Sequence, residues 1–456
     1  MLNLIKNEFV KLFSRKVVYI FIVVTALFML LMCYLNSFSS NNEYDPSHGL
    51  KDTINTLEIQ LENTSKKTSE YYSIETQLYM TRMQLNNEDT WVLDYLEDNA
   101  DLIYAYHESI DSENLDPEYK ENLNKEFLLI DETIKNNDWE SFVNSKISKL
   151  NVELDNLNSA DDKKEKEAIN YEISMLNKRL KDDIAFNKNY ISIAINDAVY
   201  NKYEILKDNP DAKANLLKAE YVIENEIDAI SSHPLKSQIS GYVLDYGMFI
   251  IMFALFISGT ILSNEFSKGT IKSLLVVPYS RSKILLSKFI TVIIATIMFA
   301  LVMMFCNMII GIIFYGVKDL SLPVLIYNNI SNKLIVEHTI LYSLIELFVF
   351  MPTIIFFALV AFVSSIIISN SGVVIALTFI ASTFSEIINI IVIANDIKFM
   401  KYFITLNYDF TAYLYGGTNA YEPVTFGLSL IVYSIYFIII AIFGILVFNK
   451  KNIKNI

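Results

Sequence analysis

Six long runs of apolar residues divide this chain into segments of two kinds. The runs cover residues 17–35, 242–262, 289–316, 341–368, 372–394 and 428–448. Each is close to the roughly 20 residues that a helix needs to cross the hydrocarbon core of a bilayer. The first run is longer than the apolar part of a cleavable signal peptide, and no small-residue cleavage site follows it. We therefore predict six membrane-spanning helices, the first of which stays in place as an anchor.

The long stretch between the first two runs, residues 36–241, has the pattern of a helical domain. No glycine occurs between Gly49 and Gly241, so the usual source of positive φ angles for β-hairpins and tight turns is missing. Leucine and isoleucine recur every three or four residues in a background of Lys, Glu and Asn. We expect long helices over about 50–84, 187–206 and 210–230.

Two further segments of this domain predict an antiparallel helical hairpin. Their apolar positions step by three and four residues: Ile147, Leu150, Leu154 and Leu157, then Ile173, Leu176 and Leu180. Such narrow seams fit either ordinary packing inside a helical bundle or a coiled coil that binds a partner. Asp116 and Asn209 each precede a proline, which is typical of a helix N-cap followed by proline at the first helical position.

The distribution of charge predicts the orientation in the membrane. Residues 1–16, 263–288, 369–371 and 449–456 together contain 12 Lys and Arg but only two acids, Glu8 and Glu265. Cytoplasmic loops carry such an excess of positive charge, so we expect both chain ends inside the cell and residues 36–241 outside. Residues 36–241 hold 41 acids against 21 Lys and Arg, but a domain of this length does not itself decide orientation.

The residues before the first span have an amphipathic pattern. Leu2, Ile5, Phe9, Leu12 and Phe13 recur at helical spacing, with charged residues on the other faces. This pattern favours a helix that lies on the inner surface of the membrane. A basic segment that merely precedes a span is the alternative.

The cytoplasmic segment 263–288 predicts a short docking helix over about residues 267–277. Ser267 or Thr270 can cap it, and Pro278 ends it, because a residue before proline is disfavoured in the α region. Ile271, Leu274 and Leu275 then share one face. Such a face can fit a groove on a partner. The alternative is that segment 263–288 is a plain basic loop that only connects two spans.

The order of residues in this segment resembles that of ABC-2 type exporter permeases after their second span. The resemblance rests on Glu265, Gly269, Thr270, Leu274, Leu275, Pro278, Arg281 and Lys288, and in outline it covers residues 1–35 and 241–456. It implies an all-α polytopic membrane protein that works with a separate ABC ATPase subunit, which binds the ATP and Mg²⁺, and with a second permease subunit, identical or homologous. It also implies that 267–277 is a coupling helix and that the aromatic outer loop 395–427, rich in Phe and Tyr, is a re-entrant helical hairpin. An aromatic loop at the membrane surface without a gating function is the alternative for 395–427.

On this reading the chain has three parts: residues 1–35 with the connecting helix and first span, the outer helical domain 36–241, and spans two to six within 242–456. The coupling residues are Glu265, Thr270, Ile271, Leu274, Leu275 and Arg281. Glu265 is placed to pair with a basic residue of the connecting helix or of the ATPase. Lipid and the two partner subunits are the expected contacts, and nucleic acid is not.

The sequence offers little chemistry of its own. Residues 311–318 lack the Gly-Lys-Ser/Thr ending of a phosphate-binding loop, the four histidines are scattered, and Cys33 and Cys306 lie within spans. We expect no catalytic, cofactor or metal site, and hence no enzyme. A membrane-anchored sensor or scaffold, whose helical domain binds a partner without transport, is the alternative function.

Three acids lie in the apolar runs. Asp245 and Glu346 fall near the outer ends of their spans, where interfacial water can solvate them, whereas Glu386 lies more than half-way along the fifth. Glu386 is therefore a candidate for the translocation path or for a structural polar contact. The long first outer domain departs from the compact ABC-2 plan and resembles permeases for peptide-antibiotic resistance, bacteriocin immunity and sodium efflux. An antimicrobial peptide, a drug or a lipid-like molecule is the expected substrate class.

Overall fold

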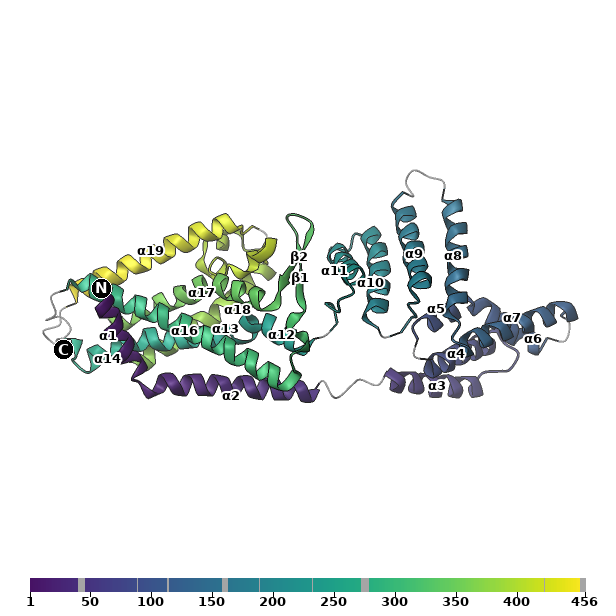
Figure 1. Cartoon of the computed structure of the whole chain (residues 1–456), viewed down its shortest axis with the longest axis horizontal. Helices are drawn as coiled ribbons and strands as arrows, with labels where there is room; N and C mark the ends of the chain where they lie inside the picture. Colours follow the sequence, from purple (N-terminus) through teal and green to yellow (C-terminus); the bar gives the residue numbers. More distant parts are fainter. Residues whose placement is uncertain are drawn as a thin grey trace. The chain divides into compact units, whose positions relative to one another are not determined.

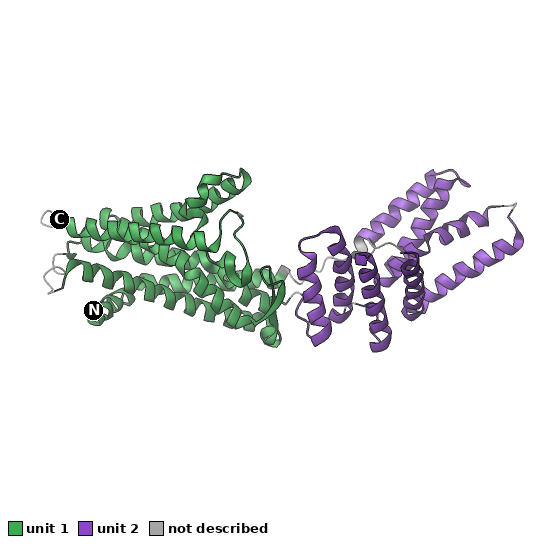
Figure 2. Ribbon diagram, turned by 90° about the horizontal axis from the view of Figure 1, so that it is seen from above, with its two compact units in different colours: residues 1–41, 232–456 green, residues 42–231 purple. Residues whose placement is uncertain are grey.

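The computed structural model describes residues 1–456 except 40–45, 88, 113–114, 158–162, 188, 232, 272–278, 422 and 452–456. The chain forms two compact units, which Figure 2 distinguishes by colour. Residues 1–41 and 232–456 form the first, here called the membrane unit. Residues 42–231 form the second, here called the helical unit.

The membrane unit contains, among the described residues, six helices long and apolar enough to cross a membrane. They are α2 (Lys16–Ser39), α13 (Tyr242–Ile261) with its continuation α14 (Ser263–Ser267), α16 (Arg281–Tyr315), α17 (Thr339–Ile367), α18 (Ser371–Ala394) and α19 (Phe426–Lys450). This confirms the predicted number of candidate spans. The chain is a mostly helical membrane protein.

The core of the membrane unit surrounds α13. This helix is largely buried and packs against α16, α17 and α18. In contrast, α2, α18 and α19 leave most of their apolar side chains exposed. Lipid tails are as apolar as these side chains, so the membrane tolerates the exposure.

The N-terminus and the last described residues of this unit, at the end of α19, lie at the same end of the bundle. Figure 1 places the N-terminus, α14 and the last turn of α19 together, and α1 (Leu2–Phe13) crosses the bundle there. The short helix α12 (Pro234–Ser240) and the strands β1 and β2 lie at the opposite end. The predicted amphipathic helix therefore exists, and it packs against α16.

A short β-hairpin corrects the all-α prediction. Strands β1 (Pro323–Asn328) and β2 (Lys333–His338) pair antiparallel, with Pro323 opposite His338. The side chain of Asn328 accepts hydrogen bonds from the backbone N–H groups of Ile330 and Ser331, which closes the turn. The β-branched residues of PVLIYN and KLIVEH favour this conformation, but the two strands are too short to stand out from the neighbouring apolar runs.

The segment 395–427 also differs from the expected form. Its described residues form three short 3₁₀ helices, η4 (Lys398–Tyr402), η5 (Ile404–Leu406) and η6 (Thr411–Gly416), rather than an α-helical hairpin. Asn407 is fully buried here, and its side chain donates to the carbonyl oxygens of Lys401 and Phe403. Side-chain bonds of this kind satisfy backbone groups that an α-helix would satisfy itself.

The helical unit is built of helices throughout its described residues. They are α3 (Pro46–Asn63), α4 (Ser69–Asn86), α5 (Trp91–Asp98), α6 (Ala100–Ile110), α7 (Pro117–Lys135), α8 (Trp139–Asn156), α9 (Lys163–Asp182), α10 (Tyr190–Glu204), the 3₁₀ turn η2 (Ile205–Lys207) and α11 (Ala212–Asn225). The predicted hairpin corresponds to α8 and α9, which pack together. Their seam residues join one core with Trp91 and Phe142.

Several boundaries in this unit differ from the sequence prediction. Asp116 caps α7 as expected, and its carboxylate accepts from the N–H of Glu118. The predicted helix 50–84 is instead two helices. Asn209 does not cap the helix after Pro210, because α11 begins at Ala212 with Asp211 at its N-cap position. Non-glycine residues make the left-handed turns that we did not expect: Lys67, Asn137, Asp183, Asp208 and Glu226 all have φ between 50° and 66°.

Candidate functional site

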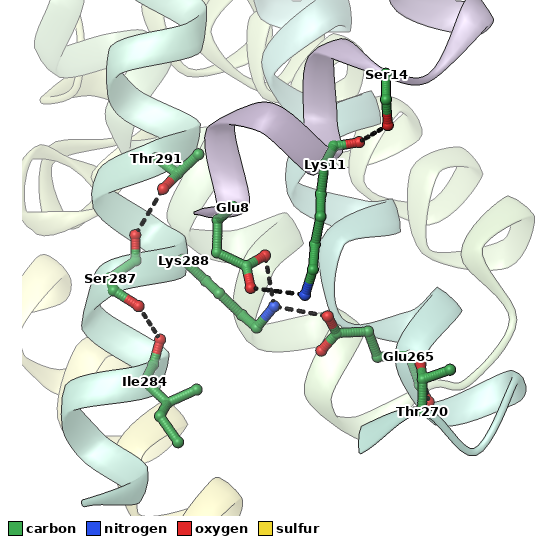
Figure 3. Close-up of polar contacts among 9 residues, drawn as sticks. All are labelled: Glu8, Lys11, Ser14, Glu265, Thr270, Ile284, Ser287, Lys288 and Thr291. Atoms are coloured by element: carbon green, nitrogen blue, oxygen red, sulfur yellow. Dashed lines mark hydrogen bonds and ion pairs between the residues drawn. The ribbon is translucent and has the colours of Figure 1, made fainter. Parts of the chain in front are cut away.

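A buried lysine links three elements at the end of the membrane unit that carries the N-terminus. The side chain of Lys288, on α16, is 0 % exposed. Its Nζ lies 2.8 Å from a carboxylate oxygen of Glu8 on α1 and 2.8 Å from one of Glu265 on α14 (Figure 3). Lys11 also approaches Glu8, at 3.3 Å, but it is mostly exposed.

Local structure explains why these three side chains meet. Glu8 and Leu12 lie one turn apart on the face of α1 that is buried against α16. Glu265 follows α13 directly in the one-turn helix α14. Charges so deeply buried are tolerated only when they are paired, because leaving one of them unpaired in a dry environment is costly. The triad therefore holds α1, α14 and α16 in a fixed relation.

Within this chain the partner of Glu265 is not a basic residue of the connecting helix, which was one of the two partners that the sequence suggested. The basic residue is Lys288, at the start of a span, whereas the connecting helix α1 contributes the acid Glu8. The second carboxylate oxygen of Glu265 is buried, and no described residue hydrogen-bonds it. In the sequence, Lys288 stood out only as the last residue of the segment that resembles ABC-2 permeases. Nothing in its local sequence shows that it is buried.

The predicted coupling helix is only partly described. Ser267 ends α14, and Gly269 follows with a φ of 67°, so the described backbone turns away at this point. Thr270 donates to the carbonyl oxygen of Glu265 at 3.5 Å. Ile271 is fully buried in the core of the membrane unit, which corrects the prediction that its side chain lies on a face open to a partner. Residues 272–278, which include Leu274, Leu275 and Pro278, lie outside the described residues.

Arg281, the last predicted coupling residue, contacts the end of α19. Its guanidinium donates to the carbonyl oxygens of Asn449, at 3.0 Å, and Lys451, at 3.4 Å. The Lys451 ammonium lies 3.9 Å from the ring centre of Phe266 and donates to the carbonyl of Ile366. Burial lowers the pKa of Lys451. The end of the last span is thereby attached to both sides of the segment between α14 and α16.

Glu386 lies in a second place of interest, a cavity of about 620 Å³ between α13, α17, α18 and the 3₁₀ segment. Glu346 and Asp409 line the same cavity, and its described lining contains no Lys, Arg or His. Asp245 instead lines a neighbouring cavity with Tyr315. The structure thus brings Glu346 and Glu386, two of the three intramembrane acids, together. It adds Asp409, which the sequence did not single out because it lies in the aromatic segment 395–427. Carboxylates around such a space attract cations.

Comparison with known proteins places the chain in a family. Residues 212–454 match the family model described as "Protein of unknown function (DUF2705)". The uncharacterised protein YhcI of Bacillus subtilis is 28 % identical over 261 residues, which covers 55 % of this chain and 80 % of YhcI. The uncharacterised membrane protein YdbK of the same organism is 27 % identical over 206 residues, 43 % of this chain and 75 % of YdbK. No solved structure matches the chain.

Proposed function

This chain belongs to the family of proteins of unknown function DUF2705, and we propose that it is the permease subunit of an exporter of the ABC-2 type. In this proposal a separate ABC ATPase binds ATP and Mg²⁺ and hydrolyses the nucleotide. The permease moves the substrate outward and has no nucleotide site of its own. Its chain ends face the cytoplasm, and the helical unit lies outside, as the distribution of Lys and Arg favours.

The buried triad of Glu8, Lys288 and Glu265 is the observation that carries the proposal. A partner that pushes on the segment between α14 and α16 can do work only if that segment is attached firmly to the spans. Lys288 joins α14 to α16 and to α1, and Arg281 joins the start of α16 to the end of α19. A displacement of the segment therefore passes to several spans at once. A plain tether would need no such links.

The pathway in this proposal is completed by a second permease, identical or homologous. The apolar faces of α2, α18 and α19 remain largely exposed, which leaves room for another membrane subunit as well as lipid. Glu386, Glu346 and Asp409 would contribute an acidic region to the path. Among the candidate substrates, which are an antimicrobial peptide, a drug or a lipid-like molecule, this region favours those that carry positive charge.

Affinity purification of the tagged full-length chain in mild detergent, followed by mass spectrometry, tests the proposal. We expect an ATPase with a phosphate-binding loop to co-purify and to be stimulated by the permease. Leu274→Asp should abolish both effects, because a carboxylate buried at a partner's apolar groove remains unpaired. Lys272→Gln, on the polar side of the predicted helix, is the matched control.

Two outcomes would count against the proposal. Recovery of Leu274→Asp with normal ATPase binding and stimulation would show that residues 267–277 do not couple the two subunits. Purification of the wild-type chain without any ATPase, but with a partner held through residues 42–231, would instead support the membrane-anchored sensor or scaffold.

A further inference from the structure

A groove of about 330 Å³ lies between α16, α17 and α19, and its walls are almost entirely apolar. Its lining includes Leu285 and Phe289 of α16, Phe362 of α17, and Phe437 and Ala441 of α19. The groove is separate from the acidic cavity that holds Glu386, because the two share no lining residue.

Small residues on α19 shape this groove. Ala441 and Gly444 are three residues apart on one face of the helix and both line the groove. A Cβ at Gly444 would lie only 2.7 Å from Val363, so glycine permits the close approach of α19 to α17. Leu286, which lines the opposite wall, is half exposed. The groove is therefore accessible from the surroundings of the bundle, which in a membrane are lipid.

One end of the groove is polar and positively charged. Ser282 and Lys283, in the first turn of α16, are its polar lining residues. The Lys283 side chain is exposed, and its ammonium forms no ion pair with the described residues. The Ser280 hydroxyl accepts from the N–H of Lys283. The N-terminus of a 35-residue helix adds a partial positive charge at the same place.

Few negative charges on the protein can balance this end. Within the described parts of residues 1–16, 263–288 and 449–456, the acids are Glu8 and Glu265. Both contact Lys288 at 2.8 Å and are thereby already paired. Arg281, beside the groove, donates to backbone carbonyl oxygens. The positive charge of Lys283 and its surroundings therefore remains available to a ligand.

We propose that this groove is a binding site for an anionic phospholipid. One acyl chain lies along Leu285, Phe289 and Ala441, and the headgroup phosphate contacts Lys283 and the first turn of α16. An apolar groove alone would accept any acyl chain. The cation and the helix N-terminus at its end select a headgroup with a net negative charge, as basic pockets between membrane helices do.

Lipid binding to the full-length chain in detergent tests this proposal. The probes are phosphatidylglycerol and phosphatidylcholine with the same two acyl chains, and retained lipid is counted by native mass spectrometry. We expect the wild-type chain to bind phosphatidylglycerol several-fold more tightly. Lys283→Gln should weaken phosphatidylglycerol binding about fivefold, the effect of roughly one basic residue near a membrane surface, and reduce the preference for this lipid over phosphatidylcholine.

Three controls make the result specific. Lys268→Gln removes an exposed lysine at the same end of the unit that does not line the groove, and it should behave as wild type. Ala441→Phe fills the groove and should reduce the binding of both lipids. Inorganic phosphate should not compete with phosphatidylglycerol, because the acyl chain supplies much of the affinity.

The proposal is wrong if the wild-type chain binds both lipids equally, or if Lys283→Gln and Lys268→Gln have the same effect. Competition by inorganic phosphate would also overturn it, since the site would then bind an anion without a lipid chain. Lys283 is exposed, so its substitution leaves the folded protein intact and these outcomes remain interpretable whatever Ala441→Phe does to stability.

Discussion

Lys288 and Glu8 are 280 residues apart in the chain, yet the ammonium nitrogen of one lies 2.8 Å from a carboxylate oxygen of the other. Glu265 approaches the same ammonium, also at 2.8 Å (Figure 3). Two acids thus share one cation that has no exposed surface. Removal of that cation is far more damaging than removal of one acid, because it leaves two like charges together with only the exposed Lys11 close to one of them.

The first prediction is that Lys288→Met destabilises the membrane unit by about 3–5 kcal/mol, the usual cost of breaking a buried ion pair. The measurement is the thermal unfolding midpoint of the full-length chain in detergent. The neutral triple variant Glu8→Gln, Lys288→Met and Glu265→Gln should recover most of the loss, since no unpaired charge then remains. Lys11→Gln, which removes the exposed partner of Glu8, should cost less than about 1 kcal/mol. A stable Lys288→Met protein would contradict the structural role of the triad.

The second prediction concerns orientation in the membrane. Single cysteines replacing Glu126 in the helical unit and Ser331 in the β-hairpin turn should react with a membrane-impermeant thiol reagent added outside intact cells. A cysteine replacing Lys268 should react only after the membrane is opened. All three positions are exposed, so access to the reagent depends on the side of the membrane alone. Labelling at position 268 from outside would reverse the proposed orientation.

The third prediction uses Arg179, a buried cation without a carboxylate partner in the described structure. Its guanidinium donates to Ser192, Asn196 and the carbonyl oxygens of Ile184 and Ala185, and it stacks on Phe186. Burial lowers its pKa to about 10. Arg179→Lys should destabilise the helical unit by about 2–3 kcal/mol, because an ammonium cannot satisfy this planar set of acceptors.

Tryptophan fluorescence measures this effect without isolating the unit. The chain has two tryptophans, Trp91 and Trp139, and both are buried in the core that contains Phe186. Their emission during urea unfolding of the full-length chain therefore reports on the helical unit. Lys178→Gln, which removes only a surface ion pair with Asp182, should change the free energy of unfolding by less than about 0.5 kcal/mol. Equal midpoints for the two variants would show that the buried contacts of the Arg179 guanidinium do not stabilise the helical unit.

The fourth prediction is a dependence on pH that comes from His107. This histidine is buried beside the hydroxyl of Thr76, and burial lowers its pKa. The unfolded chain therefore binds a proton more readily than the folded one below about pH 6.5. The stability that the neutral ring contributes is complete above that pH and is lost as the pH falls towards the folded-state pKa.

Urea unfolding of wild type and His107→Gln, followed by tryptophan emission at pH 7.5 and 5.5, measures this contribution of His107 to the free energy of unfolding. Wild type should lose more stability on acidification, by at most about 1.4 kcal/mol per pH unit. Glu75 and His107 line one cavity of the helical unit. Burial raises the pKa of Glu75, so its protonation stabilises the folded state at low pH and opposes the effect of His107. Both proteins retain Glu75, so the difference between them isolates His107. An identical pH dependence would exclude this role.

Local patterns in the sequence determined the spans and most of the helices. A span needs about 20 consecutive apolar residues whatever its neighbours are, so α2, α13, α17 and α18 could be located from composition alone. The N-cap at Asp116 is equally local, since the carboxylate bonds a backbone N–H two residues away. The hairpin of α8 and α9 followed from apolar spacing along each helix.

Tertiary structure decided what depends on residues distant in the chain. The sequence marked Glu265 as a coupling residue, but only the packing of α1 on α16 makes Glu8 and Lys288 its neighbours. The same holds for the cavity that unites Glu386 with Glu346 and Asp409, and for the groove beside Lys283. Helical periodicity specifies which residues share a face but not which faces meet, because that choice depends on packing across the whole bundle.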